Sequence, residues 1–179
     1  PQASKERTRR PSAQEIQQIC EALHYSESEP PRLITQRCAI ALLFAVETAM
    51  RAGEICALKW ENIHFDRRIA HVAQSKNGHP RDVPLTKRAI ALLEKLRTID
   101  PISVFKIQAH SLDVLFRRAR DNCGITDLHF HDSRREALTR LSKKVPVETL
   151  AKISGHRSLN ILLNVYYRPD MAEIADMLD

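Results

Sequence analysis

The sequence has few glycines and few cysteines. Four glycines occur in 179 residues, and apolar residues recur at helical spacing over long segments. We therefore expect a mainly helical protein. The cysteines are few and far apart, with no Cys-x-x-Cys pair: Cys20, Cys38, Cys56 and Cys123. This spacing argues against a zinc ribbon and favours reduced thiols in a cytoplasmic protein.

The sequence also lacks a signal peptide and any apolar run long enough to cross a bilayer. Its 43% hydrophobic and 28% charged residues are ordinary for a soluble globular domain. We expect no membrane partner. Because the chain begins at Pro1 rather than at methionine, we also expect it to be part of a longer protein.

Negative charge is in the minority, and the formal net charge is +6. A basic balance indicates an anionic partner, with nucleic acid the first candidate, although charge alone also fits an ordinary basic protein. Residues 1–11 are polar and basic and end in Pro11, so they are expected to form a linker. Residues 12–179 have the length of one domain.

Local signals predict the order of elements. Ser12 and Glu15 form a capping box at the start of a helix. Residues 33–46 are apolar on nearly all sides, as in a central buried helix. Asn77-Gly78 predicts a β-hairpin, and Pro84 places the second strand at a sheet edge. Helical patterns then continue to the end of the chain, where residues 171–178 form an amphipathic helix. The expected fold class is mainly α with a small antiparallel β-sheet.

The segment 128–141 suggests a phosphate site. Leu128 and Phe130 have a buried character, and a helix is expected to open at about Asp132. This start places His131 at the helix mouth and Arg134 one turn inside it. Free N–H groups at a helix start suit a phosphate, and a guanidinium can hold two phosphate oxygens at once.

Four more polar side chains stand at element junctions or on the last long helix. Arg51 lies between two helices, and Lys76 lies at the hairpin turn. His156 follows Gly155, a predicted helix C-cap. Tyr166 lies on an apolar helical stripe, beside Tyr167. Each has an ordinary alternative: a helix-capping arginine, a solvated turn lysine, a loop histidine, a core tyrosine.

Two histidines, His129 and His131, alternate along a short extended segment. They could share a metal ion, but no third ligand lies nearby in the sequence. No metal site is therefore expected.

In this order, the set resembles the catalytic domain of tyrosine site-specific recombinases, the phage integrase family. The resemblance covers the chain from about Ser12. The matching pieces are Thr-Ala-Met-Arg51-Ala-Gly-Glu54, Ser-Lys76-Asn-Gly followed by Val83-Pro-Leu, His131-Asp-Ser-Arg134, Gly155-His156 and a downstream tyrosine.

The resemblance implies the chemistry of DNA strand cleavage and rejoining. A tyrosine attacks a backbone phosphodiester and forms a 3′-phosphotyrosine link, without metal, ATP or another cofactor. Arg51 and Arg134 would bind the non-bridging oxygens, and Lys76 would protonate the leaving 5′ oxygen. His131 and His156 would add hydrogen bonds.

The sequence departs from the family pattern in two places. The common spacing puts the nucleophile at Val165; we assign it to Tyr166, one residue on, with Tyr167 as the competitor. Arg135 stands where the family often has a histidine, and an arginine there suits contact with phosphate.

The resemblance also implies a homotetramer on double-stranded DNA that exchanges strands through a Holliday junction, and a monomer without DNA. The final helix would dock on a neighbouring protomer. Two alternatives remain: a type IB topoisomerase with the same chemistry, and a DNA-binding or regulatory module that has lost catalysis.

Overall fold

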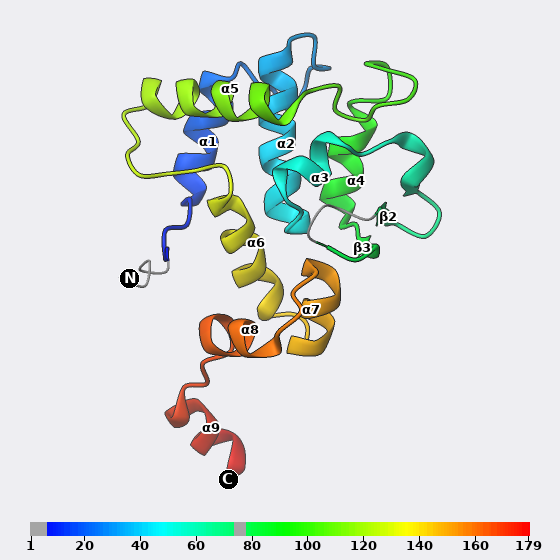
Figure 1. Cartoon of the computed structure of the whole chain (residues 1–179). Coiled ribbons are helices and arrows are strands. Elements are labelled where there is room, and N and C mark those ends of the chain that lie inside the picture. Colours follow the sequence, from blue (N-terminus) through cyan, green and yellow to red (C-terminus); the bar gives the residue numbers. More distant parts are fainter. Residues whose placement is uncertain (1–6, 74–77) are drawn as a thin grey trace, which may run out of the picture.

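The computed structural model describes residues 7–73 and 78–179. These residues are mainly helical with a small antiparallel sheet, which confirms the predicted fold class (Figure 1). The elements are α1 (Ala13–Ala22), α2 (Ile34–Thr48), α3 (Ala52–Cys56), the 3-10 helix η1 (Trp60–Asn62), β1 (Ile63–His64), β2 (Ile69–Val72), β3 (Arg81–Pro84), α4 (Lys87–Glu94), α5 (Ala109–Asn122), α6 (Asp132–Ser142), α7 (Val147–Ser154), α8 (Leu159–Tyr166) and α9 (Met171–Leu178).

Helix α2 is the centre of the larger core. It contacts α1, α3, α4, α5 and α6, and residues Cys38 to Ala41 have no exposed surface. A helix surrounded on all sides must be apolar all round, so the predicted buried helix is confirmed. The predicted capping box of α1 is present too: the Ser12 hydroxyl accepts the Glu15 N–H, and the Glu15 carboxylate accepts the Ser12 N–H.

The three strands pair in the order β1-β2-β3, with Ala70 opposite Val83. Strand β3 is an edge strand, as Pro84 predicted, and it packs against α7. The predicted turn residue Asn77 lies outside the described residues.

A smaller core lies among α6, α7 and α8, below α2 in Figure 1. Its buried members come from these helices and from the end of α2: Ala49, Ala137, Leu138, Leu150, Ala151 and Leu162. Gly155 ends α7 with a φ of 76°, which confirms the predicted glycine C-cap. The chain between the two cores, from Ala49 to Arg51, therefore joins α2 to α3 where the cores meet.

Ser158 stands at the N-cap of α8, and its side chain makes no capping hydrogen bond. One detail of α8 differs from the sequence-based expectation. The predicted apolar stripe is only partly buried: Leu162 is covered, whereas Leu159 and Leu163 are 38% and 39% exposed. The physical reason is that, among the described residues, α8 has its main contacts with α6 and α7, so one side of the stripe stays exposed.

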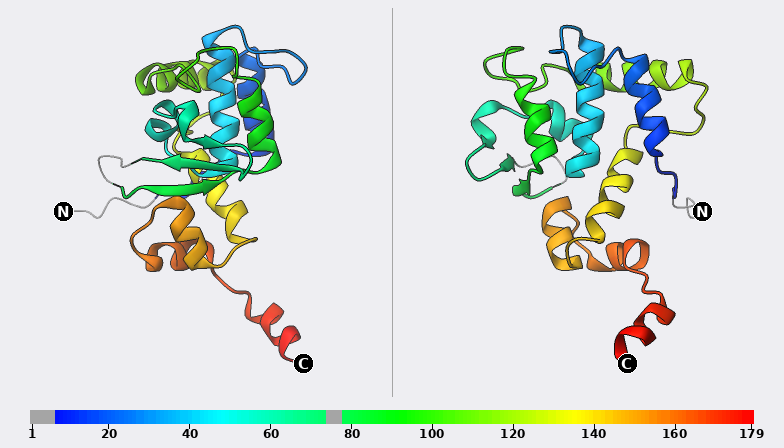
Figure 2. Two further views of the ribbon diagram at one scale, coloured as in Figure 1. Left: turned by 90° about the vertical axis from the view of Figure 1, so that its right-hand side faces the viewer. Right: turned by 180° about the vertical axis from the view of Figure 1, so that it is seen from behind.

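Helix α9 forms as predicted and extends away from the body of the molecule (Figures 1 and 2). None of its residues is buried, and Met177 and Leu178 are about as exposed as a side chain can be, at 79% and 81%. Within residues 7–73 and 78–179, no helix has the length and apolar character that a membrane crossing needs.

Candidate active site

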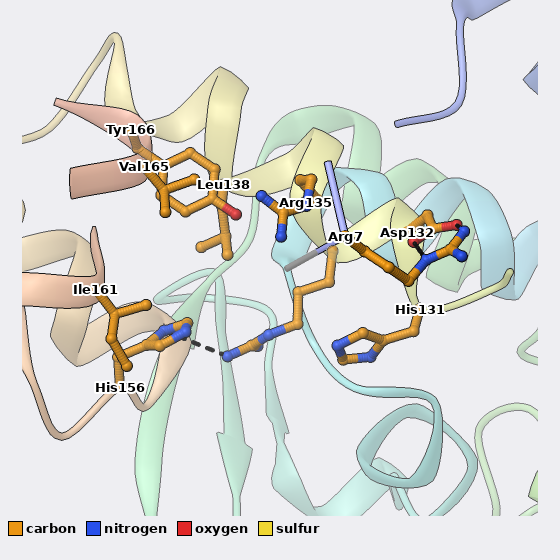
Figure 3. A pocket seen from close by; sticks show the side chains of 10 residues that line it. Arg7, His131, Asp132, Arg135, Leu138, His156, Ile161, Val165 and Tyr166 are labelled. Carbon is orange, nitrogen blue, oxygen red and sulfur yellow. Dashed lines mark hydrogen bonds and ion pairs between the residues drawn. The ribbon is translucent and has the colours of Figure 1, made fainter. Parts of the chain in front are cut away.

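A pocket of about 150 Å³ opens between α6, the end of α7 and α8. Four of the residues singled out by the sequence line it: His131, Arg134, His156 and Tyr166 (Figure 3). They come from two helices, α6 and α8, and from the segments before α6 and after α7, so the fold brings together side chains that are up to 35 positions apart in the sequence.

Arg134 forms the floor of this pocket and is 4% exposed. Its Nη1 donates to the carbonyl of Ala49 at the end of α2. Its Nη2 donates to the carbonyl of Ser154 at 2.7 Å and faces Nδ1 of His156 at 3.5 Å. Burial, followed by the charges of Arg51 and Arg81, lowers the pKa of Arg134 to about 10. The guanidinium is thus charged at neutral pH, buried, and held by backbone carbonyls at the ends of α2 and α7.

His156 is neutral at physiological pH. Burial and the nearby charges of Arg134 and Arg51 lower its pKa to about 4. Its Nδ1 lies 2.7 Å from the Ser154 hydroxyl and faces the Arg134 guanidinium. Because a guanidinium can only donate, Nδ1 is the acceptor, and the proton of the neutral ring is assigned to Nε2. His156 can therefore donate one hydrogen bond from Nε2.

His131 lies at the exposed rim of the pocket, directly before α6 as predicted. Partial burial and the charges of Arg134 and Arg51 lower its pKa. The expectation of free N–H groups at this helix mouth is wrong. The N–H groups of Asp132, Ser133 and Arg134 donate to the carbonyls of residues 129, 130 and 131, because the chain enters α6 through a tight turn. Any phosphate here must be bound by side chains.

Arg51 is adjacent to the pocket and is attached to Glu54. Its backbone N–H and its Nη1 donate to the Glu54 carboxylate at 2.9 Å and 3.2 Å, and its side chain remains 39% exposed. Its charge lowers the pKa of Arg134 and of both pocket histidines, so it acts on the same space.

Glu54 has a second partner that sequence reasoning missed. Arg81 of β3 donates to both carboxylate oxygens, each at 2.8 Å, and the two side chains are 4% and 8% exposed. Burial alone raises the pKa of Glu54, but the bonds from Arg81 and from the Arg51 backbone outweigh it and lower the pKa to about 2. A signal was available: Arg81 and Val83 alternate along a strand, so they share its inner face.

The two neighbouring tyrosines have different surroundings. Tyr166 lines the pocket, and the negative charge of an ionised Tyr166 raises the pKa of Arg134. In Figure 3 its hydroxyl points towards the side of the pocket that carries Arg135. The hydroxyl of Tyr167 instead donates to the carbonyl of Val145 at 2.7 Å, outside the pocket, and burial raises the pKa of Tyr167. Val165, the position expected from the common spacing, also lines the pocket.

Lys76, the predicted general acid, lies outside the described residues. The predicted linker ends in described residues that contact the domain. Arg7 donates to the Asp132 carboxylate at 2.7 Å and 3.1 Å, and to Asp127 at 2.8 Å, at the edge of the same pocket. Over the described ranges, no three His, Cys, Asp or Glu side chains are grouped as metal ligands.

The arrangement defines a class of protein: a helical domain with a basic pocket, a neutral histidine and an accessible tyrosine. The family model described as "Phage integrase family" matches residues 9–173. A Haemophilus influenzae protein described as an integrase/recombinase is 51% identical over 181 residues, which cover all of this chain and 59% of the relative. The chain therefore belongs to the phage integrase family, the tyrosine recombinases.

Solved structures of integrases have the same fold. The Tn1549 transposon integrase in complex with transposon right end DNA is 14% identical, with a TM-score of 0.76 over 100% of this chain and 69% of that one. A lambda integrase dimer bound to a COC′ core site is 21% identical, with a TM-score of 0.71 over 92% and 50%. The chain thus spans 50% to 69% of these longer chains and shares their fold over that part.

Proposed function

We propose that the chain is the catalytic part of a site-specific DNA recombinase that cleaves and rejoins double-stranded DNA through a 3′-phosphotyrosine intermediate. The observation that carries this proposal is that Tyr166, the buried guanidinium of Arg134 and the neutral ring of His156 line one pocket. The type IB topoisomerase alternative uses the same chemistry but swivels one strand instead of exchanging two duplexes.

In the proposed reaction, the Tyr166 oxygen attacks the scissile phosphorus while the bond to the 5′ oxygen breaks. The free phenol has a pKa near 10, so forming phenolate at neutral pH costs about 4 kcal/mol. The positive charge of Arg134, and of Arg51 next to it, offsets part of that cost and stabilises the negative charge on the non-bridging oxygens. Lys76 would supply the proton that the leaving 5′ oxygen takes up.

The histidines supply hydrogen bonds at this centre. His156 donates from Nε2 to a non-bridging oxygen, because its Nδ1 is used by Ser154 and Arg134. His131, at the rim, accepts the proton that Tyr166 releases; its lowered pKa keeps the ring neutral and able to accept it. Energy is retained in the phosphotyrosine bond, so a second 5′ hydroxyl reverses the reaction without ATP. Since arginines provide the charge, we expect cleavage to proceed in EDTA.

The proposed partner is double-stranded DNA, bound as a tetramer of protomers on two duplexes that exchange strands through a Holliday junction. The solved relatives named above contain DNA, and the net charge of +6 suits it. The exposed apolar face of α9 suits docking on a neighbouring protomer. Binding should weaken steeply with salt, because each phosphate contact releases counterions.

The test is a covalent trap. The substrate is a library of nicked duplexes with a randomised central sequence. After cleavage, the fragment that carries the free 5′ hydroxyl dissociates and cannot be rejoined. Any phosphotyrosine adduct therefore persists in detergent, and its DNA identifies the site. We expect Tyr166→Phe to abolish the adduct and Tyr167→Phe to retain it. An adduct that survives in Tyr166→Phe and disappears in Tyr167→Phe would move the nucleophile by one residue. If no DNA sequence gives an adduct, the alternative of a non-catalytic DNA-binding or regulatory module is favoured.

A further inference from the structure

Arg81 does not line the pocket, yet it contacts the supports of three proposed site residues: Arg51, Arg134 and His156. We propose that Arg81 is a positioning residue: it keeps the charge of Arg51 available to the phosphate and fixes the turn that carries His156. This inference rests on the proposed function.

The first support is Glu54. Arg81 engages both carboxylate oxygens at 2.8 Å, whereas the Arg51 guanidinium reaches one of them at 3.2 Å. An ionised carboxylate beside Arg51 competes with a phosphate for the same guanidinium. Arg81 makes the shorter bonds to both carboxylate oxygens. Glu54 therefore holds the Arg51 backbone N–H, and the Arg51 side chain can turn towards an anion.

The second support is the end of α7. Nε of Arg81 donates to the carbonyl of Ile153 at 2.8 Å. The guanidinium also lies against Gly155, where a Cβ would stand 3.3 Å from its carbon and nitrogen atoms. The turn held in this way contains Ser154, whose carbonyl accepts from Arg134, and it leads directly to His156.

Arg81 itself has no position from which to contact DNA. Its side chain is 8% exposed, and Nε, Nη1 and Nη2 already donate to Ile153 and Glu54. Its effect on the reaction must therefore pass through Arg51 and His156. Lysine at this position keeps the charge but cannot make the paired contact with Glu54 and the bond to Ile153 together.

The matched control is Arg88. It also makes a two-pronged pair with a glutamate, Glu27, with Nη1 donating at 2.9 Å, but this pair is exposed and contacts none of the site residues. Arg88→Lys therefore makes the same chemical change at a place where the inference predicts no effect on cleavage.

The experiment measures single-turnover adduct formation on the trapped site over a range of DNA concentrations. One substrate carries an ordinary scissile phosphate, and the other a methylphosphonate, which has one negative oxygen fewer. With phosphate, Arg81→Lys should lower the maximal rate by about 10- to 100-fold and leave the half-saturating DNA concentration unchanged. With methylphosphonate the loss should be smaller, because less charge must be matched by Arg51. Arg88→Lys should match the wild type on both.

A double variant tests whether Arg81 acts through Arg51. If it does, Arg81→Lys costs less rate in the Arg51→Ala background than in the wild type, since coupled residues are not additive, and the part of the loss that passes through the His156 turn remains. Losses that multiply, or a loss that is equal on both substrates, overturn the inference. Should Arg81→Lys fail to fold, Glu54→Gln with Arg81→Gln removes both buried charges together. No carboxylate then competes for Arg51, but the bond to Ile153 is lost, so the maximal rate should still fall, and a full rate would overturn the inference.

The outcomes separate the two proposals. An inactive wild-type chain overturns the proposed function, and the inference with it. An active wild-type chain with Arg81→Lys at full rate overturns the inference alone.

Discussion

Glu54→Gln removes the negative charge that two arginines contact in a nearly dry environment. Breaking a buried ion pair by removing one partner typically costs about 3–5 kcal/mol, because the other charge is left without compensation. The pKa of Glu54 gives a second figure: its fall from 4.5 to about 2 on folding corresponds to roughly 3 kcal/mol. We therefore expect the variant to lose about 3 kcal/mol of unfolding free energy at pH 7.

The pH dependence of this difference has a definite sign. Glu54 has a lower pKa in the folded chain than in the unfolded chain, so its contribution is present above pH 4.5 and is lost as the pH falls towards 2. Wild type and variant should therefore converge in acid. Urea unfolding at pH 7 and pH 3.5 measures this, and the difference should shrink by about 1 kcal/mol or more between them.

Glu27→Gln provides the control for this prediction. Glu27 also pairs with an arginine through two contacts, but the two side chains are 58% and 39% exposed. An exposed pair contributes less than about 1 kcal/mol, so this variant should be nearly as stable as the wild type. A Glu54→Gln loss no larger than that of Glu27→Gln, or equal at both pH values, would refute the argument from burial.

Two further predictions concern the turn after α7. His156 should titrate in NMR with a pKa of about 4 and show the Nε2–H tautomer; a midpoint near 6.5 would contradict its burial beside Arg134. Gly155→Ala should destabilise the chain by about 1–2 kcal/mol, measured by urea unfolding, because an L-residue is strained at a φ of 76°; a variant as stable as the wild type would show that the turn can adopt another conformation.

Local signals were sufficient for most of the fold. The Ser12 capping box, the Gly155 C-cap and the edge strand ending at Pro84 each follow from the chemistry of one or two residues, and each is confirmed. Their position along the chain needs no knowledge of tertiary contacts. Predicting how much of α8 is buried does require knowledge of tertiary contacts, because an apolar stripe does not reveal how many helices cover it.

The helix mouth at Asp132 shows the same limit at the site. The sequence indicated where α6 begins, but not how the chain enters it. The entering turn contains local bonds, from the His129 N–H to the Asp132 carboxylate and from the Ser133 hydroxyl to the Phe130 carbonyl, and Phe130 packs edge-on against Phe116 of α5 at 5.6 Å between ring centroids. In this turn the carbonyls of residues 129–131 accept the first N–H groups of α6.

The choice between Tyr166 and Tyr167 could not be settled by spacing either. Helix α8 ends at Tyr166, and Tyr167 is its C-cap with a non-helical backbone, so the two side chains meet different surroundings. The hydrogen bond from Tyr167 to Val145 supports Tyr166 as the proposed nucleophile. Arg81 was missed for a related reason, since a charged residue on a short strand is usually taken to face solvent.

The charges around the pocket explain why an anion should bind there more strongly as the proposed reaction proceeds. Glu54 is engaged by Arg81 in paired bonds, and Asp132 is engaged by Arg7. Glu54 therefore offsets the charge of Arg134 only in part, and burial together with the charges of Arg51 and Arg81 still lowers the pKa of Arg134 to about 10. A phosphodiester relieves this repulsion, and a transition state with more charge on its oxygens relieves it further. Because the guanidinium is fixed by the carbonyls of Ala49 and Ser154 before DNA arrives, little reorganisation is needed when that charge develops.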